Sequence, residues 1–74
     1  MTLVMRTTNR GFAIADFRDS CDAPCTIQKS SLASEDCIWL GVHKPGSDRM
    51  HLTQEQVADL LPLLQRFVET GELI

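Results

Sequence analysis

A chain of 74 residues, 43% of them hydrophobic, is expected to form one small domain near the lower size limit for independent folding. The net charge of −3 provides no general footprint for nucleic acid, which needs concentrated Lys and Arg, and no stretch approaches the roughly 18 apolar residues of a membrane span. With a polar N-terminus and an odd number of cysteines, three, the chain is expected in the cytoplasm of a host cell, without a disulfide framework.

The first half of the chain has the alternation typical of β-strands. Residues 1–10 are expected to be a partly ordered N-terminal segment, and the first strand is expected over residues 11–19. Phe12 and Ile14 share one face of that strand, whereas Phe17 falls on the opposite face. Either a bulge intervenes or both faces of the strand are partly covered.

Three more strands are predicted after a turn at 19–24, whose short polar side chains and proline are typical of turns. They are expected over 25–29, 37–42 and 49–53. Trp39 points away from the apolar face of the third strand, which consists of Ile38, Leu40 and Val42.

The last third of the chain predicts an amphipathic helix. Thr53 and Gln56 form the Thr-x-x-Gln pattern of a capping box, and Gly71 stands where a left-handed cap is expected. Pro62 removes one backbone N–H in mid-helix, so a kink is expected there. One apolar stripe follows the helix: Val57, Leu60, Leu61, Leu64, Phe67 and Val68.

Together these elements predict an α+β fold, a four-stranded antiparallel β-meander with one C-terminal helix across one face. Residues 11–74 form a single ββββα domain in this prediction. A helix covering the Ile38 face leaves Trp39 and Phe17 on the open face, where their burial between two copies would stabilise a homodimer. Pairing of sheet edges is the alternative route to such a dimer.

One polar cluster is a candidate binding site for a small anionic ligand. An amide, an ammonium and two hydroxyls are expected at the end of the second predicted strand. They could hold an anionic ligand through hydrogen bonds and one charge contact. A solvated strand end is the simpler interpretation. The expected ligand contacts are Gln28, Lys29, Ser30 and Ser31, with Lys44 and Arg49 from the later loop.

Metal binding and catalysis receive weaker support. Tetrahedral zinc prefers closely spaced ligand pairs, and the spacing here is loose among Cys21, Cys25, Cys37, His43 and His51. Cys21 with either histidine, or Ser30 or Ser31 with His51, could form a nucleophile–base pair, but no third group is indicated. We therefore expect no metal, no cofactor and no enzymatic activity.

Four segments in order resemble a family of small proteins, about 70 residues long, encoded by bacteriophages and prophages. The resemblance covers roughly residues 11–70, although Asp22-Ala-Pro24 replaces the Tyr-Gly that such relatives often carry. It implies a phage origin and carries over no functional residue. The segments are Gly11-Phe12…Phe17-x-Asp19, Thr26-Ile-Gln-Lys-Ser-Ser-Leu-Ala33, Ile38-Trp-Leu-Gly41 and Met50-His-Leu-Thr…Glu55-Gln-Val57.

From these observations we expect a non-enzymatic phage accessory protein that acts by binding. The specific hypothesis is that it sequesters a cyclic-nucleotide-like signal of host defence. The alternative is an interaction module that inhibits a host protein through its open sheet face or its acidic helix. That helix carries Glu55, Asp59, Glu69 and Glu72 against Arg66. A DNA-binding regulator is the third hypothesis and is disfavoured, because the helix lacks a basic face.

Overall fold

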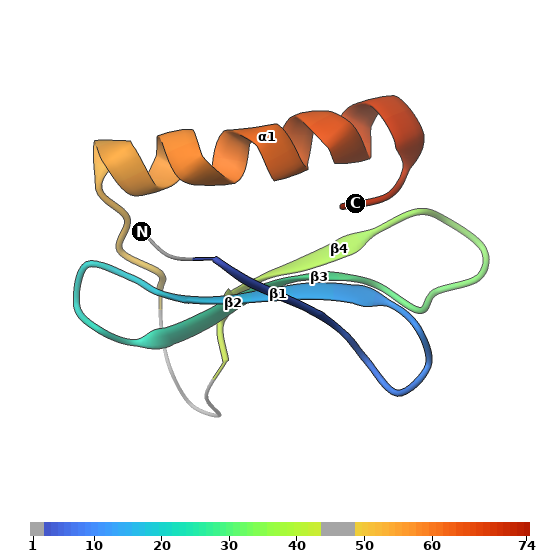
Figure 1. Ribbon diagram of the computed structural model, residues 1–74, viewed down its shortest axis with the longest axis horizontal. Coiled ribbons are helices and arrows are strands. Elements are labelled where there is room, and N and C mark those ends of the chain that lie inside the picture. Colours follow the sequence, from blue (N-terminus) through green and yellow to red (C-terminus); the bar gives the residue numbers. More distant parts are fainter. Residues whose placement is uncertain (1–2, 44–48) are drawn as a thin grey trace.

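Four antiparallel strands and one helix make up the computed structural model, which describes residues 3–43 and 49–74 (Figure 1). The elements are β1 (Val4–Thr7), β2 (Ala13–Arg18), β3 (Pro24–Lys29), β4 (Ile38–Val42) and α1 (Gln54–Thr70). The sheet has the order β1-β2-β3-β4, so each strand pairs with its neighbour in sequence. The helix α1 lies across one face of the sheet (Figure 1). The predicted α+β meander with a single covering helix is confirmed.

One of the four strands is not the one that the sequence predicted. The N-terminal segment supplies β1, which pairs with β2 from Val4 opposite Asp16 to Thr7 opposite Ala13. The turn between them ends at Gly11, whose φ of 85° suits glycine and whose N–H donates to the Thr8 carbonyl. An Asn-Arg-Gly turn ahead of the first recognised strand was the available signal for this hairpin.

The strand expected over 49–53 is absent from the described residues 49–53. The backbone there bonds to the β2–β3 turn instead of to a ladder. His51 donates its N–H to the Asp19 carboxylate at 3.0 Å, and its carbonyl accepts the N–H of Ser20 at 2.8 Å. Residues 49–53 therefore connect the start of the helix to the β2–β3 turn.

Both predicted caps of α1 are confirmed. Thr53 Oγ1 accepts the N–H of Gln56 at 3.1 Å, and Gln56 Oε1 accepts the N–H of Thr53 at 3.0 Å. At the other end Gly71 adopts φ 77° and donates its N–H to the Phe67 carbonyl. The Gln56 amide also donates to the carbonyl of Arg18 in β2, so the same residue caps the helix and docks it on the sheet.

Substitution of Pro62 should stabilise the protein. The helix continues through Pro62, which is exposed and leaves the Ala58 carbonyl without its helical donor. Pro62→Ala restores that N–H and should raise the free energy of unfolding by about 1–3 kcal/mol in urea denaturation. Gln65→Ala, an exposed change on the same helix, should leave stability within about 0.5 kcal/mol. A loss of stability in Pro62→Ala would show that the proline shapes the fit of α1 to the sheet.

The core lies between α1 and the two central strands. Ala13, Ala15 and Phe17 of β2 face the helix, so the expected position of Phe17 on the open face is wrong. Two alanines take covered positions in the same cluster as Leu60 and Leu73, and no bulge is needed. Ile14 faces the other way and is buried between its cross-strand neighbours on that side. The remaining buried members are Cys25, Ile27, Leu60 and Leu73.

The prediction for β4 is confirmed. Ile38 and Val42 pack against the core under the helix, whereas Trp39 lies on the open face and is 66% exposed. The open face is the side of the sheet away from α1, and we use that name below.

Candidate functional site

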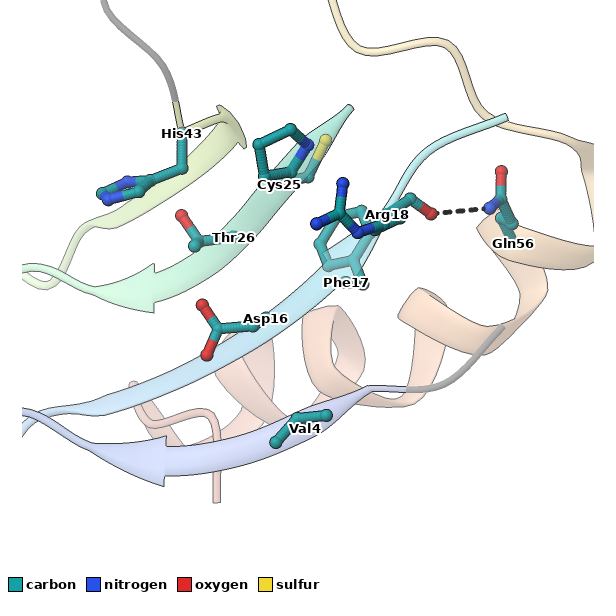
Figure 2. Close-up of a pocket in the computed structure, with 9 residues that line it drawn as sticks. Val4, Asp16, Phe17, Arg18, Cys25, Thr26, His43 and Gln56 are labelled. Carbon is teal, nitrogen blue, oxygen red and sulfur yellow. Dashed lines mark hydrogen bonds between the residues drawn. The ribbon is translucent and has the colours of Figure 1, made fainter. Parts of the chain in front are cut away.

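The open face is hollowed across three strands. A hollow of about 390 Å³, which we call the His43 hollow, lies there and extends to the end of the sheet where Gln56 of α1 meets Arg18. Its volume is within the range of small-ligand sites. Figure 2 shows Asp16, Thr26 and His43 side by side on β2, β3 and the end of β4, with the helix behind the sheet. The hollow is lined by Val4, Asp16, Phe17, Arg18, Pro24, Cys25, Thr26, His43 and Gln56.

A charge pair forms one wall of the His43 hollow. The guanidinium of Arg6 donates to the two carboxylate oxygens of Asp16 at 2.6 and 3.3 Å. The bond from Arg6 holds the pKa of the Asp16 carboxyl below its ordinary value, and the same bond raises the pKa of Arg6. Asp16 is therefore an ionised acceptor whose charge is already balanced, and it still has lone pairs to accept N–H groups of a ligand.

Arg18 supplies a cation two residues further along β2. One of its N–H groups donates to the Asp22 carbonyl at 2.9 Å, and the Asp22 carboxylate lies 3.8 Å away. The side chain is otherwise exposed, and a guanidinium has five donors, so most of them face solvent beside the hollow. The bond to Asp22 holds the guanidinium near the hairpin, where it can meet an anionic group.

A second hollow of about 350 Å³ adjoins the first and shares Thr26 and His43 with it. We call it the Gly41 hollow. It is lined by Thr26, Gln28, Trp39, Leu40, Gly41, Val42 and His43. Gln28 stands opposite Trp39 across β3 and β4, and a Cβ placed on Gly41 would meet no atom within 4 Å. Missing volume at Gly41 is therefore what opens this second hollow.

The ligand cluster predicted from sequence is not assembled in the structure. Gln28 and Lys29 are consecutive in β3, so they lie on opposite faces, and only Gln28 is on the open face. Ser30 is buried and accepts the N–H of Leu32 at 3.1 Å, while Ser31 is exposed in the following loop. Of the two residues expected from the later loop, Arg49 is exposed and lines neither hollow, and Lys44 lies outside the described residues.

Lys29 has a structural environment of its own. It is only 6% exposed and donates to the Asp36 carboxylate at 2.8 Å, with Glu72 at 4.0 Å and its ammonium 5.9 Å from the centre of the Phe67 ring. The hydrogen bond to Asp36 raises the pKa of Lys29. The ammonium therefore fastens the β3–β4 loop to the end of α1 and is not available to an anion on the open face.

The β2–β3 turn brings a serine, a cysteine and a histidine together. Ser20 Oγ lies 2.6 Å from His51 Nδ1 and also donates to the His51 carbonyl at 2.8 Å. Cys21 Sγ lies 3.7 Å from the same Nδ1. This arrangement helps to hold the turn closed against the segment before α1.

Asp19 organises that turn from inside. It is 6% exposed, and its carboxylate accepts three backbone N–H groups, from Cys21 and Ala23 at 2.9 Å each and from His51 at 3.0 Å. These bonds, the one from His51 foremost, hold the pKa of the Asp19 carboxyl below its ordinary value. Asp22 closes the turn with φ 63°. Asp-x-x-Asp at a hairpin tip was a visible signal for the turn, but its bond to His51 was not predictable from sequence.

Among the described residues, no three His, Cys, Asp or Glu side chains are placed to hold a metal ion. The part of the chain that the structure describes has no helix long and apolar enough to cross a membrane. No known family model, curated protein or solved structure matches this chain. Function therefore has to be argued from the open face itself.

Proposed function

We propose that the protein is a non-enzymatic binding protein that holds a small nucleotide-like ligand in the His43 hollow. The observation that carries this proposal is one concave site lined by an ionised acceptor and, two residues further along the same strand, by an exposed guanidinium. Asp16 is suited to the N–H edge of a base, and Arg18 to a phosphate oxygen. Thr26, opposite Asp16 on β3, and His43, just beyond the end of β4, line the same hollow and supply further hydrogen-bonding groups.

Charge distribution supports a mixed ligand over a simple anion. Arg6 offsets the charge of Asp16, so the carboxylate does not exclude a phosphate from the neighbouring position. A ligand with a polar planar edge and a negative group can bond to both Asp16 and Arg18, and a nucleotide combines these features. Taken with the resemblance to small phage proteins, sequestration of a nucleotide signal is the role that we propose for this site.

Calorimetric titration against cyclic dinucleotides, cyclic trinucleotides and ADP-ribose derivatives tests the proposal. Arg18→Gln should weaken binding of the active compound by about 10–100-fold, because it removes a charge-assisted hydrogen bond. Arg66→Gln makes the same charge change on the exposed side of α1 and should leave the affinity within about twofold. The absence of a heat signal for every compound, with circular dichroism showing a folded protein, would refute the proposed function.

A further inference from the structure

The edge of β4 is an unprotected sheet edge. β4 is last in the sheet order, and among the described residues no strand pairs with its outer side. The N–H of Ser30 donates to the Cys37 carbonyl, and the N–H of His43 donates to the Pro24 carbonyl. Every second residue from Cys37 to His43 therefore directs its backbone groups towards β3. Ile38, Leu40 and Val42 therefore direct their backbone N–H and C=O groups outwards. Natural edges are usually blocked by a charge, a proline or a bulge, and Ile38-Trp-Leu-Gly-Val42 contains no charged residue and no proline.

The helix has an apolar seam above the same edge. Val57, Leu61 and Val68 are between 49 and 78% exposed, and with the half-buried Leu64 they repeat at steps of four, three and four residues. That spacing is the pattern of a helix–helix contact. Seven residues occupy this side of α1 and none is charged: Gln54, Val57, Ala58, Leu61, Leu64, Gln65 and Val68.

The position of the seam follows from the docking of α1. Gln56 reaches the Arg18 carbonyl in β2, and Glu72 lies 4.0 Å from Lys29, so α1 runs parallel to β3. Successive residues of α1 are rotated by about 100° around the helix axis, which places the seam more than a quarter turn from Gln56. Because α1 is right-handed and runs parallel to β3, this rotation turns the seam towards β4. Leu40 of β4 faces the helix side, since it pairs with Ile27, and yet is 41% exposed. The seam and Leu40 thus form one apolar surface, continuous with the edge.

We propose that this surface binds a second copy of the chain in a two-fold dimer, with β4 paired antiparallel to the partner's β4 and α1 packed against the partner's α1. A second copy fits both layers at once, because its own edge and seam have the same relative positions and the same lack of charge. An extended peptide would satisfy the strand edge and leave the seam exposed. An uncharged surface also avoids contacts between like charges when two copies of net charge −3 associate.

The open face supplies a further point of self-complementarity. If Leu40 lies opposite the partner's Leu40, the outward backbone groups of Ile38, Leu40 and Val42 all find partners, and Trp39 stands opposite the partner's Gly41. The exposed indole then enters the Gly41 hollow of the other copy, where a missing side chain leaves space. An aromatic side chain placed over an edge glycine is a known way of stabilising strand pairs. Each copy donates one Trp39 and one hollow.

Sedimentation velocity over a range of concentrations tests the dimer. The wild-type chain should reach twice its 8.3 kDa mass at about 100 µM. Leu40→Asp places two like charges at the two-fold axis and should weaken the dimer at least about 100-fold. Leu32→Asp, an equally exposed leucine in the β3–β4 loop, should leave it unchanged within about twofold. A folded wild-type monomer at that concentration would overturn the proposal, and so would a dimer that survives Leu40→Asp.

Cross-linking tests the register independently. Opposed Cα atoms in a bonded antiparallel pair are about 5.5 Å apart, which a disulfide can span. In a Cys21→Ser background, which removes the exposed thiol, Leu40→Cys should form an intersubunit disulfide under mild oxidation, and Leu32→Cys should not. Equal cross-linking of the two variants would contradict the register. The dimer does not depend on the proposed ligand, since Arg18→Gln should leave the mass unchanged and Leu40→Asp should leave the His43 hollow intact.

Discussion

Asp19→Ala should cause the largest loss of stability among single polar substitutions, a fall in melting temperature of roughly 10 °C or more. The change leaves three backbone N–H groups without their acceptor inside a tight turn. It also removes one of the bonds that hold His51, so the segment before α1 is fastened less firmly to the β2–β3 turn. Thermal denaturation followed by circular dichroism measures the effect.

Asp19→Asn keeps the size of the side chain but removes its negative charge and one acceptor oxygen, so it separates these two contributions to stability. Its carbonyl oxygen keeps an acceptor for Cys21 and Ala23, but its amide presents a donor to the N–H of His51, so an intermediate loss is expected. A melting temperature equal to that of the wild type would show that the bond to His51 contributes nothing.

The same carboxylate should make the protein sensitive to acid. The pKa of Asp19 is lower in the folded state than its ordinary value of 3.8, so the unfolded chain binds the proton more readily. Its stabilising contribution is therefore fully present above that value and is lost as the pH falls through the lower, folded-state pKa. Asp16 is shifted in the same direction by Arg6 and adds to the effect. Below about pH 4, Asp19→Asn should show a shallower decline in stability than the wild type.

Ile27→Ala should leave the chain largely unfolded at 25 °C. Ile27 is fully buried at the centre of β3, and removal of its side chain costs about 2–5 kcal/mol. A core of this size supplies only about 3–5 kcal/mol in total. Urea denaturation should show a midpoint near zero, whereas Ile27→Val should lose only about 0.5–1.5 kcal/mol.

Leu32→Ala provides the matched control, because Leu32 is half exposed in a loop and should lose little. Similar midpoints for Ile27→Ala and Ile27→Val would contradict the assignment of Ile27 to the centre of the core.

Local sequence signals predicted the helix well and the faces of the strands less well. The capping residues Thr53, Gln56 and Gly71 act within one turn of the chain, so their geometry follows from sequence alone. The facing of β2 was misjudged because the large side chain of Ile14 suggested the covered side. In the structure that side carries Ala13, Ala15 and Phe17, which are covered by Leu60 and Leu73 from far along the chain, a tertiary effect that alternation does not encode.

The candidate site likewise combines residues that local sequence groups together and residues that only the tertiary structure brings together. The Gln28–Ser31 segment groups polar residues in sequence, but strand geometry sends Lys29 to the helix side, where Asp36 meets it. Asp16 and His43 are 27 positions apart in the chain and share one hollow only because β3 aligns their strands. No local pattern links them, since the hollow is formed by the order of strands in the sheet.

The strand order also sets how the chain reaches its native state. Every strand pairs with the one before it, so the sheet can grow by successive hairpins that each close a short loop at small entropic cost. Contacts between distant parts of the chain arise chiefly when α1 docks. The helix follows all four strands in the chain, so it emerges after them during synthesis, and until then the face around Ile27 and Phe17 lacks the cover of α1. Residues 54–73 thus complete the core and end the interval in which an uncovered apolar sheet is open to aggregation.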